Sequence, residues 1–150
     1  MAEPVPCGRI DDGTHVLALR VYYEDTDAAG IVYYANYLKF AERGRTEMMR
    51  LLGAEHRSMA EGEGLAWAVR RCAIDYLRPA RLDDLLEVRT RLVDVGAARL
   101  DAEQVVRRAA VDLARLDLRL ACIDRRGRPA RLPAAMRSAL LAIIPPQSRA

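Results

Sequence analysis

Two carboxylates, Asp25 and Asp27, stand in a short segment whose neighbours suit chemistry on a carbonyl group. Alternating residues that end near Tyr22 predict a strand, residues 28–30 (Ala-Ala-Gly) predict a turn through which backbone can approach a ligand, and periodic apolar residues begin at Tyr34. Asp27 is therefore expected between a strand and a helix N-terminus. A carboxylate can act there as nucleophile or general base, while unpaired N–H groups of the first helical turn stabilise an oxyanion. Attack on a thioester carbonyl needs both.

Two blocks of sequence carry a resemblance to a known family. Residues 22–37 read YYEDTDAAGIVYYANY and are followed by ERGRTE at residues 42–47, and residues 78–84 read RPARLDD. With these blocks, over about residues 20–123, the chain resembles the 4-hydroxybenzoyl-CoA thioesterase family and in particular its Tol-Pal-associated (YbgC-type) branch. At Tyr34 the chain has the tyrosine of the 4-hydroxybenzoyl type, where many members of the Tol-Pal-associated branch have histidine.

The resemblance implies a fold, an activity and a site. The fold is the hotdog fold, an antiparallel sheet wrapped around a long central helix, whose subunits pair edge to edge and bind ligand between them. The activity is hydrolysis of an acyl-CoA thioester to a free acid and coenzyme A. The catalytic carboxylate is Asp27, the second acidic residue of the Asp-Thr-Asp triplet, and the oxyanion donor is the backbone N–H of Tyr34. The residues leave open whether Asp27 is the nucleophile or a general base, and a link to the Tol-Pal cell-envelope system is also implied.

Other residues are expected to contact substrate without joining the chemistry. Those beside the carboxylate or on the later strands are Gly30, Val32, Tyr33, Trp67 and Arg71. Arg70, Arg71 and Arg99 are candidates for contacts with the coenzyme A phosphates, because arginine forks match phosphate geometry, but exposed strand positions are commonly only solvated. The sequence leaves open which arginines bind phosphate. Asp25 is expected to order the turn through hydrogen bonds to backbone.

Composition predicts one compact domain over residues 1–150, since 51% of the residues are hydrophobic. No apolar run approaches the ~20 residues of a membrane span, and the first nine residues are too short and polar for a signal peptide. Three widely spaced cysteines suit reduced thiols. A cytoplasmic location is expected.

Charge and histidine content argue against nucleic acid, metal and cofactor binding. The net charge of +3 comes from arginine, and the pairs at residues 107–108 and 125–126 are interrupted by Asp112, Asp117 and Asp124. His15 and His56 have no cysteine or carboxylate at ligand spacing. No metal and no cofactor is expected.

Periodicity predicts the order of elements. A first strand covers residues 15–22 after the Asp12-Gly13 turn, and a helix of about five turns runs from Tyr34 until it stops at Gly53. A short helical or irregular stretch is expected near residues 54–60, strands at 65–77, 85–95, 99–108 and 111–123, and a last helix from Pro133 to about Ala142. One early helix followed by four strands predicts an α+β fold. The unpaired edge of such a sheet predicts a homodimer or homotetramer.

Two alternatives belong to other classes. The Asp-Thr-Asp triplet is also compatible with a phosphoryl-transfer site of the haloacid dehalogenase kind, which expects a parallel sheet and a lysine, and Lys39 is the only lysine. A hotdog module that binds an acyl-CoA or a protein without catalysis is the other alternative. Retention of Asp27 favours catalysis.

Overall fold

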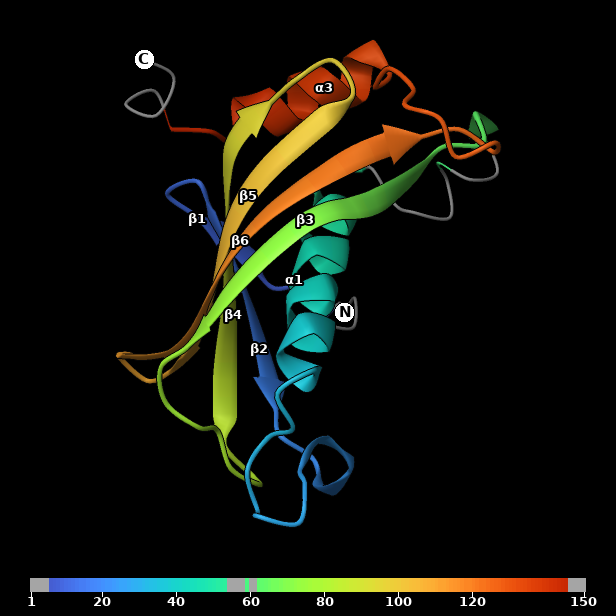
Figure 1. Cartoon of the computed structure of the whole chain (residues 1–150). Helices are drawn as coiled ribbons and strands as arrows, with labels where there is room; N and C mark the ends of the chain where they lie inside the picture. The colour runs from blue at the N-terminus through green and yellow to red at the C-terminus, as the bar shows by residue number, and fades with distance from the viewer. Residues whose placement is uncertain (1–5, 54–58, 60–61, 146–150) are drawn as a thin grey trace.

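A computed structural model describes residues 6–53, 59 and 62–145 (Figure 1). Within these residues the chain forms one six-stranded antiparallel sheet and two α-helices. The elements in chain order are β1 (Arg9–Asp11), β2 (Thr14–Arg20), a short 3-10 helix η1 (Tyr23–Asp25), α1 (Asn36–Leu51), β3 (Ala66–Tyr76), β4 (Leu85–Val95), β5 (Arg99–Arg108), β6 (Val111–Ile123) and α3 (Ala134–Ala142). The predicted α+β class is confirmed.

The element boundaries agree with the sequence prediction except near the carboxylates and at the N-terminus. Strands β4, β5 and β6 begin and end at the predicted residues. Strand β2 ends at Arg20 because the chain turns into η1, and α1 begins two residues later than Tyr34. Strand β1 was missed, because its three residues are all exposed and carry no alternation. Most of residues 54–60, including His56, lies outside the described residues.

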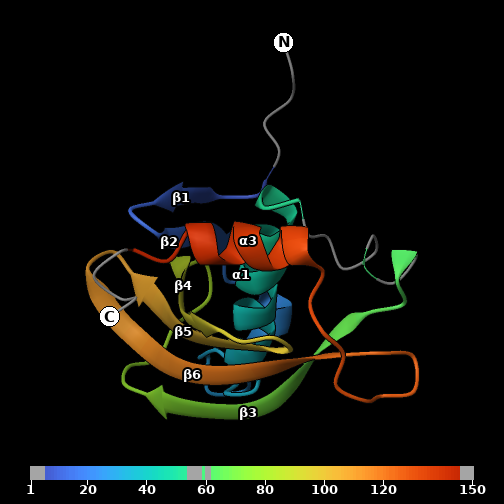
Figure 2. The ribbon, with the colours of Figure 1, turned by 90° about the horizontal axis from the view of Figure 1, so that it is seen from above.

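The sheet has the strand order β1-β2-β4-β5-β6-β3, so the long strand β3 lies at an edge. The sheet curls around α1, which packs against β2, β4 and β5, and α3 lies across one end (Figure 2). Because neighbouring strands in the described chain are antiparallel, the phosphoryl-transfer alternative, which needs a parallel sheet, is wrong.

Helix α1 approaches the sheet most closely at Gly44. A Cβ atom added to Gly44 would lie 2.7 Å from Val88 Cγ1 and 3.3 Å from both Gln104 Nε2 and Thr90 Oγ1. A buried polar network joins the same layers. Gln104 Nε2 donates to the Ala41 carbonyl and to Thr90 Oγ1, each at 2.9 Å, and Gln104 Oε1 accepts a 2.9 Å bond from Arg45 Nη1. A glycine inside the helix is thus explained by the close contact.

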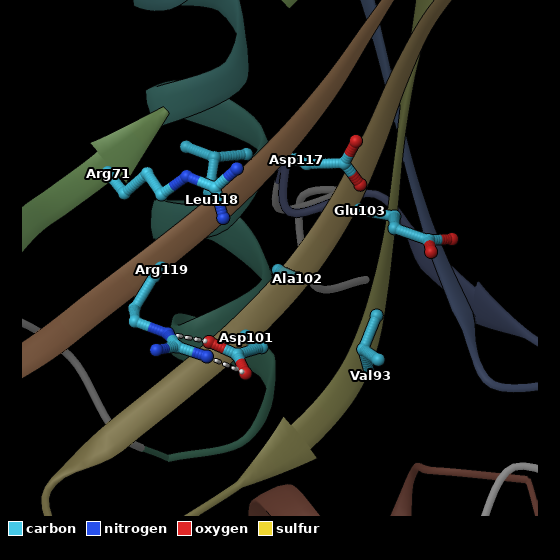
Figure 3. A pocket seen from close by; sticks show the side chains of 8 residues that line it. All are labelled: Arg71, Val93, Asp101, Ala102, Glu103, Asp117, Leu118 and Arg119. Atoms are coloured by element: carbon cyan, nitrogen blue, oxygen red, sulfur yellow. Dashed lines mark hydrogen bonds and ion pairs between the residues drawn. The ribbon is translucent and has the colours of Figure 1, made fainter. Parts of the chain in front are cut away.

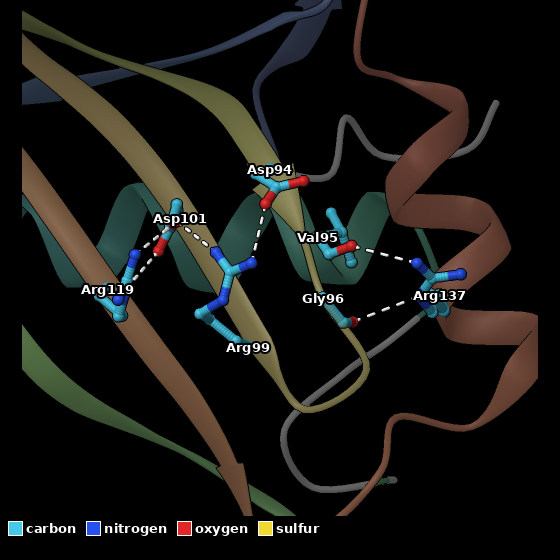
Figure 4. A network of polar contacts seen from close by, with 7 residues as sticks. All are labelled: Asp94, Val95, Gly96, Arg99, Asp101, Arg119 and Arg137. Atoms are coloured by element: carbon cyan, nitrogen blue, oxygen red, sulfur yellow. Dashed lines mark hydrogen bonds and ion pairs between the residues drawn. The ribbon is translucent and has the colours of Figure 1, made fainter. Parts of the chain in front are cut away.

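Helix α3 is attached to the β4–β5 hairpin through arginine. Arg137 donates to the Gly96 carbonyl (3.2 Å) and to the Val95 carbonyl (3.3 Å), as Figure 4 shows. On the adjoining strand, Arg99 pairs with Asp94 at 2.8 Å and also with Asp101. These contacts close the end of the sheet that lies away from the N-terminus of α1.

We expect Gly44→Ala to destabilise the protein although alanine is the better helix former. The helix preference favours alanine by about 1 kcal/mol, but overpacking at a close contact costs about 1–3 kcal/mol. Thermal unfolding followed by circular dichroism measures the balance. Gly62→Ala is the matched control, because a Cβ there meets nothing within 4 Å and Gly62 does not have a positive φ. A Gly44→Ala midpoint at or above that of wild type would contradict the packing argument.

Candidate active site

Asp27 lies in a tight loop between η1 and α1. The Asp27 N–H donates to the Ile31 carbonyl (2.9 Å), and the Gly30 N–H donates to the Asp27 carbonyl (3.0 Å). The Asp27 side chain accepts a 2.8 Å hydrogen bond at Oδ1 from the Ala29 N–H. Gly30 has φ of 79°, a conformation in which L side chains are strained. The loop therefore presents the exposed Asp27 carboxylate on a short, hydrogen-bonded turn.

Asp25 connects this loop to the start of α1. Its Oδ2 accepts a 2.8 Å hydrogen bond from the Tyr22 N–H. Its carbonyl accepts bonds from the Tyr33 N–H (2.9 Å) and from Asn36 Nδ2 (2.8 Å). These contacts order the turn, so the two carboxylates of the triplet have different surroundings.

The backbone around Tyr34 is held on both sides while its N–H points to no acceptor. The Tyr33 carbonyl accepts a 2.8 Å bond from the Asn36 N–H, and the Tyr34 carbonyl accepts a 2.9 Å bond from the Tyr76 hydroxyl. Within the described ranges no group accepts a hydrogen bond from the Tyr34 N–H. A fixed, unpaired N–H next to a helix N-terminus is the geometry that an oxyanion donor requires.

An apolar hollow of about 320 Å³ lies beside Tyr34. Tyr76 packs edge-on against Tyr37, with ring centroids 5.5 Å apart, and against Tyr34 at 6.3 Å. The hollow is lined by Ile31, Val32, Tyr34, Tyr37, Tyr76, Leu77, Arg78 and Pro79. Its size and apolar wall suit an acyl chain or a pantetheine arm.

Tyr33 and Val32 sit differently on this loop. The Val32 side chain is buried and its N–H donates to the Ala80 carbonyl at 2.8 Å, so Val32 fixes the wall of the hollow. The exposed Tyr33 ring lies 4.8 Å from the Tyr34 ring, and a hydrogen bond with Tyr34 raises the pKa of the Tyr33 hydroxyl.

The second sequence block, residues 78–84, holds the loop in place. The Ala80 N–H donates to the Tyr37 hydroxyl (3.0 Å), while the Ala80 carbonyl accepts from Val32. The Asp84 carboxylate accepts bonds from the Arg81 N–H (2.8 Å) and from Arg108 Nη1 (2.7 Å). Although burial acts to raise the pKa of Asp84, these two donors lower it below its usual range. This block was identified from the sequence by its resemblance, but its role in holding the Asp27 loop in place was not predicted. The residues from Pro79 to Asp84 are typical of a turn and indicate this role only weakly.

Two of the predicted substrate contacts lie elsewhere in the protomer. Trp67 is half-buried at the start of β3, on the face of the sheet that packs against α1, where it pairs with the buried Cys122. Arg71 lies on the opposite, outer face, in a hollow of about 320 Å³ with Asp101, Asp117 and Arg119 (Figure 3). Within one protomer, Asp27, Gly30, Val32, Tyr33 and Tyr34 therefore lie on one loop before α1, whereas Trp67 and Arg71 lie on β3.

Asp27 and Tyr34 also face different hollows. Asp27 lines a hollow of about 460 Å³ with Tyr23, Thr26, Ala28, Gly30 and Leu82, and it does not line the apolar hollow. In the described part of the chain no group of three or more His, Cys, Asp or Glu side chains could hold a metal ion. The arrangement can therefore supply a carboxylate and a backbone donor.

Comparisons with known proteins identify the family of this arrangement. The model of the thioesterase-like superfamily matches residues 21–140, which include both sequence blocks. The chain is 45% identical over 106 residues to the acyl-CoA thioesterase YbgC of Haemophilus influenzae, covering 71% of this chain and 78% of the relative. It is 38% identical over 107 residues to the acyl-CoA thioester hydrolase YbgC of Escherichia coli O6:H1, covering 71% and 79%.

Solved structures agree with these relatives. A probable thioesterase from Bartonella henselae superposes with a TM-score of 0.78 at 40% identity, covering 80% of this chain and 99% of that chain. A hypothetical protein from Thermus thermophilus superposes with a TM-score of 0.80 at 28% identity, covering 87% and 97%. The hotdog fold predicted from the sequence is confirmed.

Proposed function

Because the chain belongs to the thioesterase-like superfamily, we propose that it hydrolyses an acyl-CoA thioester to a free acid and coenzyme A, with Asp27 and the Tyr34 N–H as its catalytic groups. The activity itself follows from relatives 38–45% identical to the chain that are acyl-CoA thioesterases. They also argue against the module that binds without catalysis. The observation that supports the two residue roles is the unpaired Tyr34 N–H on a backbone fixed from both sides, one short loop away from the Asp27 carboxylate.

Two routes use the same groups. In the nucleophilic route a carboxylate oxygen of Asp27 bonds to the thioester carbon, the C–S bond breaks, coenzyme A leaves as a thiolate, and water cleaves the mixed anhydride. In the general-base route Asp27 takes a proton from water while the water oxygen bonds to the carbonyl carbon, and the departing thiolate accepts that proton. In both routes the Tyr34 N–H donates to the oxyanion, a contribution of about 3 kcal/mol.

A second copy of the chain is part of the proposal. Strand β3 is a long edge strand, and its α1 side is uncovered at Val69, which is 51% exposed although it pairs with the buried Leu120. Such an edge favours antiparallel pairing with an identical strand across a two-fold axis. That pairing brings Trp67 at the start of β3 in one copy toward Tyr76 at the end of β3 in the other. In the proposed dimer, Trp67 of one copy therefore lies near the substrate site of the other.

A charge on the uncovered side of β3 is expected to abolish the dimer and turnover. Val69→Lys changes an exposed side chain, so the protomer should fold, but the lysine would lie in the proposed interface. Light scattering should give half the wild-type mass. Ala73→Lys is the control, because Ala73 lies on the outer face of the same strand opposite Asp117 and should leave mass and turnover unchanged. A Val69→Lys dimer of full activity would exclude this interface.

Removal of the Asp27 charge tests the chemical role directly. Asp27→Asn keeps an oxygen that can accept the Ala29 N–H bond, so we expect an unchanged unfolding midpoint and a kcat at least ~100-fold lower. Asp25→Asn makes the same charge change two residues away and should lower turnover less and thermal stability more. Near wild-type turnover of a folded Asp27→Asn enzyme would refute the mechanism. Equal losses of turnover in Asp27→Asn and Asp25→Asn would contradict the assignment of the catalytic role to Asp27 alone.

Tyr76 is expected to act as a positioning residue for the oxyanion donor. Tyr76→Phe retains the ring that packs on Tyr34 and Tyr37 but removes the bond to the Tyr34 carbonyl. We expect kcat to fall about five- to tenfold, as for the loss of roughly 1 kcal/mol, with KM and the unfolding midpoint nearly unchanged. Tyr22→Phe, which removes an exposed hydroxyl from the same motif, is the control. An unchanged kcat for Tyr76→Phe would rule this role out.

The cellular setting stays a prediction from the sequence. No helix in the described part of the chain has the length and apolar character needed to cross a membrane. A cytoplasmic location, a homotetramer built from two dimers, and a link to the Tol-Pal system are inferences from the sequence and its resemblance. They do not affect the chemistry proposed for Asp27.

A further inference from the structure

The apolar hollow beside Tyr34 meets a second, basic hollow at Leu77 and Arg78, which line both. The basic hollow has a volume of about 650 Å³ and lies between the end of β3 and the β5–β6 hairpin. Its charged lining consists of Arg78, Arg107 and Arg115 with the single carboxylate Asp112. A ligand that extends from the apolar hollow past Leu77 therefore enters a site of net positive charge.

The arginines of the basic hollow are held in place and still have guanidinium N–H groups that do not bond to a carboxylate. The N–H groups of Leu77 and Arg78 both donate to the Leu113 carbonyl, at 2.8 and 3.1 Å, which attaches this segment to β6. Asp112 accepts from Arg107 through Nε alone (2.8 Å) and from Arg115 through Nε (3.2 Å) and Nη2 (3.0 Å). Over residues 6–53, 59 and 62–145, no carboxylate pairs with the exposed Arg78 guanidinium. Unpaired guanidinium N–H groups are what a phosphate requires.

We propose that the basic hollow binds the phosphate groups of coenzyme A, while the apolar hollow takes the pantetheine arm and leads it from the thioester at Tyr34 to Arg78. This subsite rests on the proposed function and adds the residues that recognise the nucleotide end of the substrate. Arg78 is its principal contact, because it lines both hollows and lacks a carboxylate partner in the part of the chain described. Arg107 and Arg115 supply the remaining charge.

The outer hollow, where Arg71 lies, suits phosphate less well. Its lining contains three carboxylates, Asp101, Glu103 and Asp117, against Arg71 and Arg119. Asp101 already accepts two bonds from Arg119, at 2.8 and 3.1 Å. Arg99 is likewise occupied by Asp94 and Asp101. A multiply charged anion there would meet net negative charge, whereas the basic hollow offers three arginines against one carboxylate.

The test compares two substrates with the same acyl group, one on coenzyme A and one on pantetheine, which lacks the nucleotide phosphates. For Arg78→Gln we expect KM for acyl-CoA to rise about tenfold with kcat unchanged, and KM for acyl-pantetheine to stay at the wild-type value. Calorimetry with free coenzyme A should show the same loss of affinity without turnover. Arg9→Gln, on the exposed strand β1 at the opposite edge of the sheet, makes the same charge change and should alter neither KM.

Two results would overturn the subsite while leaving the thioesterase intact. One is an Arg78→Gln enzyme with wild-type KM for both substrates. The other is an increase of KM that is equal for acyl-CoA and acyl-pantetheine, because a residue that touches only the pantetheine arm gives that pattern. A tenfold loss for Arg71→Gln in place of Arg78→Gln would move the phosphates to the outer hollow. If wild type cleaved neither substrate, the proposed function itself would fail, which is a different outcome.

Discussion

The geometry of the candidate active site depends on the backbone N–H and carbonyl of Ala80. The loop that carries Asp27 has little core of its own, since residues 27–30 are exposed. It is held because the Ala80 carbonyl accepts from Val32 while the Ala80 N–H donates to the Tyr37 hydroxyl. The backbone of one residue thus joins the loop and the first turn of α1 to the segment between β3 and β4. The Asp84 carboxylate, which accepts from the Arg81 N–H and from Arg108, fixes that segment in turn.

The position of the N-terminus of α1 is also determined by a few contacts, which lie in the buried layer between α1 and the sheet. Gly44 lets α1 lie against β4, and the Gln104 amide joins Ala41, Thr90 and Arg45 across the same layer. Burial lowers the pKa of the Arg45 guanidinium, although the nearby Glu42 acts to raise it. A buried hydrogen-bond network of this kind favours one register between helix and sheet. The height of α1 along the sheet then determines where its N-terminus, and hence the Tyr34 N–H, meets the end of β3.

The features of the fold and of the candidate site that depend on local periodicity could be predicted from the sequence, whereas those that depend on contacts between distant residues could not. Strands β4 to β6 alternate between buried and more exposed residues over most of their length, so periodicity gave their limits despite the register shifts near Leu92 and Val106. The start of α1 was placed two residues early, because Tyr34 and Ala35 are apolar but belong to the loop, where the Tyr34 carbonyl bonds to Tyr76 from a distant strand. The motif itself identified the Asp27 loop, whereas the supporting contacts of Ala80 join residues far apart in the sequence.

The face of the sheet on which Arg71 lies could not be predicted from the sequence, for a different reason. A regular strand would place Trp67, Val69 and Arg71 on one face, because each is two residues from the next. The register of β3 against β6 shifts between Val69 and Arg71, so Arg70 is the extra residue of a bulge and Arg71 turns to the outer face opposite Arg119. Nothing in the local sequence marks this bulge. A single inserted residue therefore moves a predicted substrate contact from the α1 side of the sheet to the other.

Because the proposed oxyanion donor is a backbone N–H and not a side chain, the chemistry at this position is separate from the choice of substrate. The Tyr34 side chain is 62% exposed and lines the apolar hollow, while the proposed donor is its N–H. Exchange of tyrosine and histidine at this position, the difference noted between the two types of this family, changes the wall of the hollow and leaves the donor in place. The same holds for Tyr37 and Tyr76, whose rings shape the hollow while their hydroxyls hold backbone groups. Substrate range can therefore vary through ring size and polarity, as long as the hydrogen bonds that fix the peptides around Tyr34 persist.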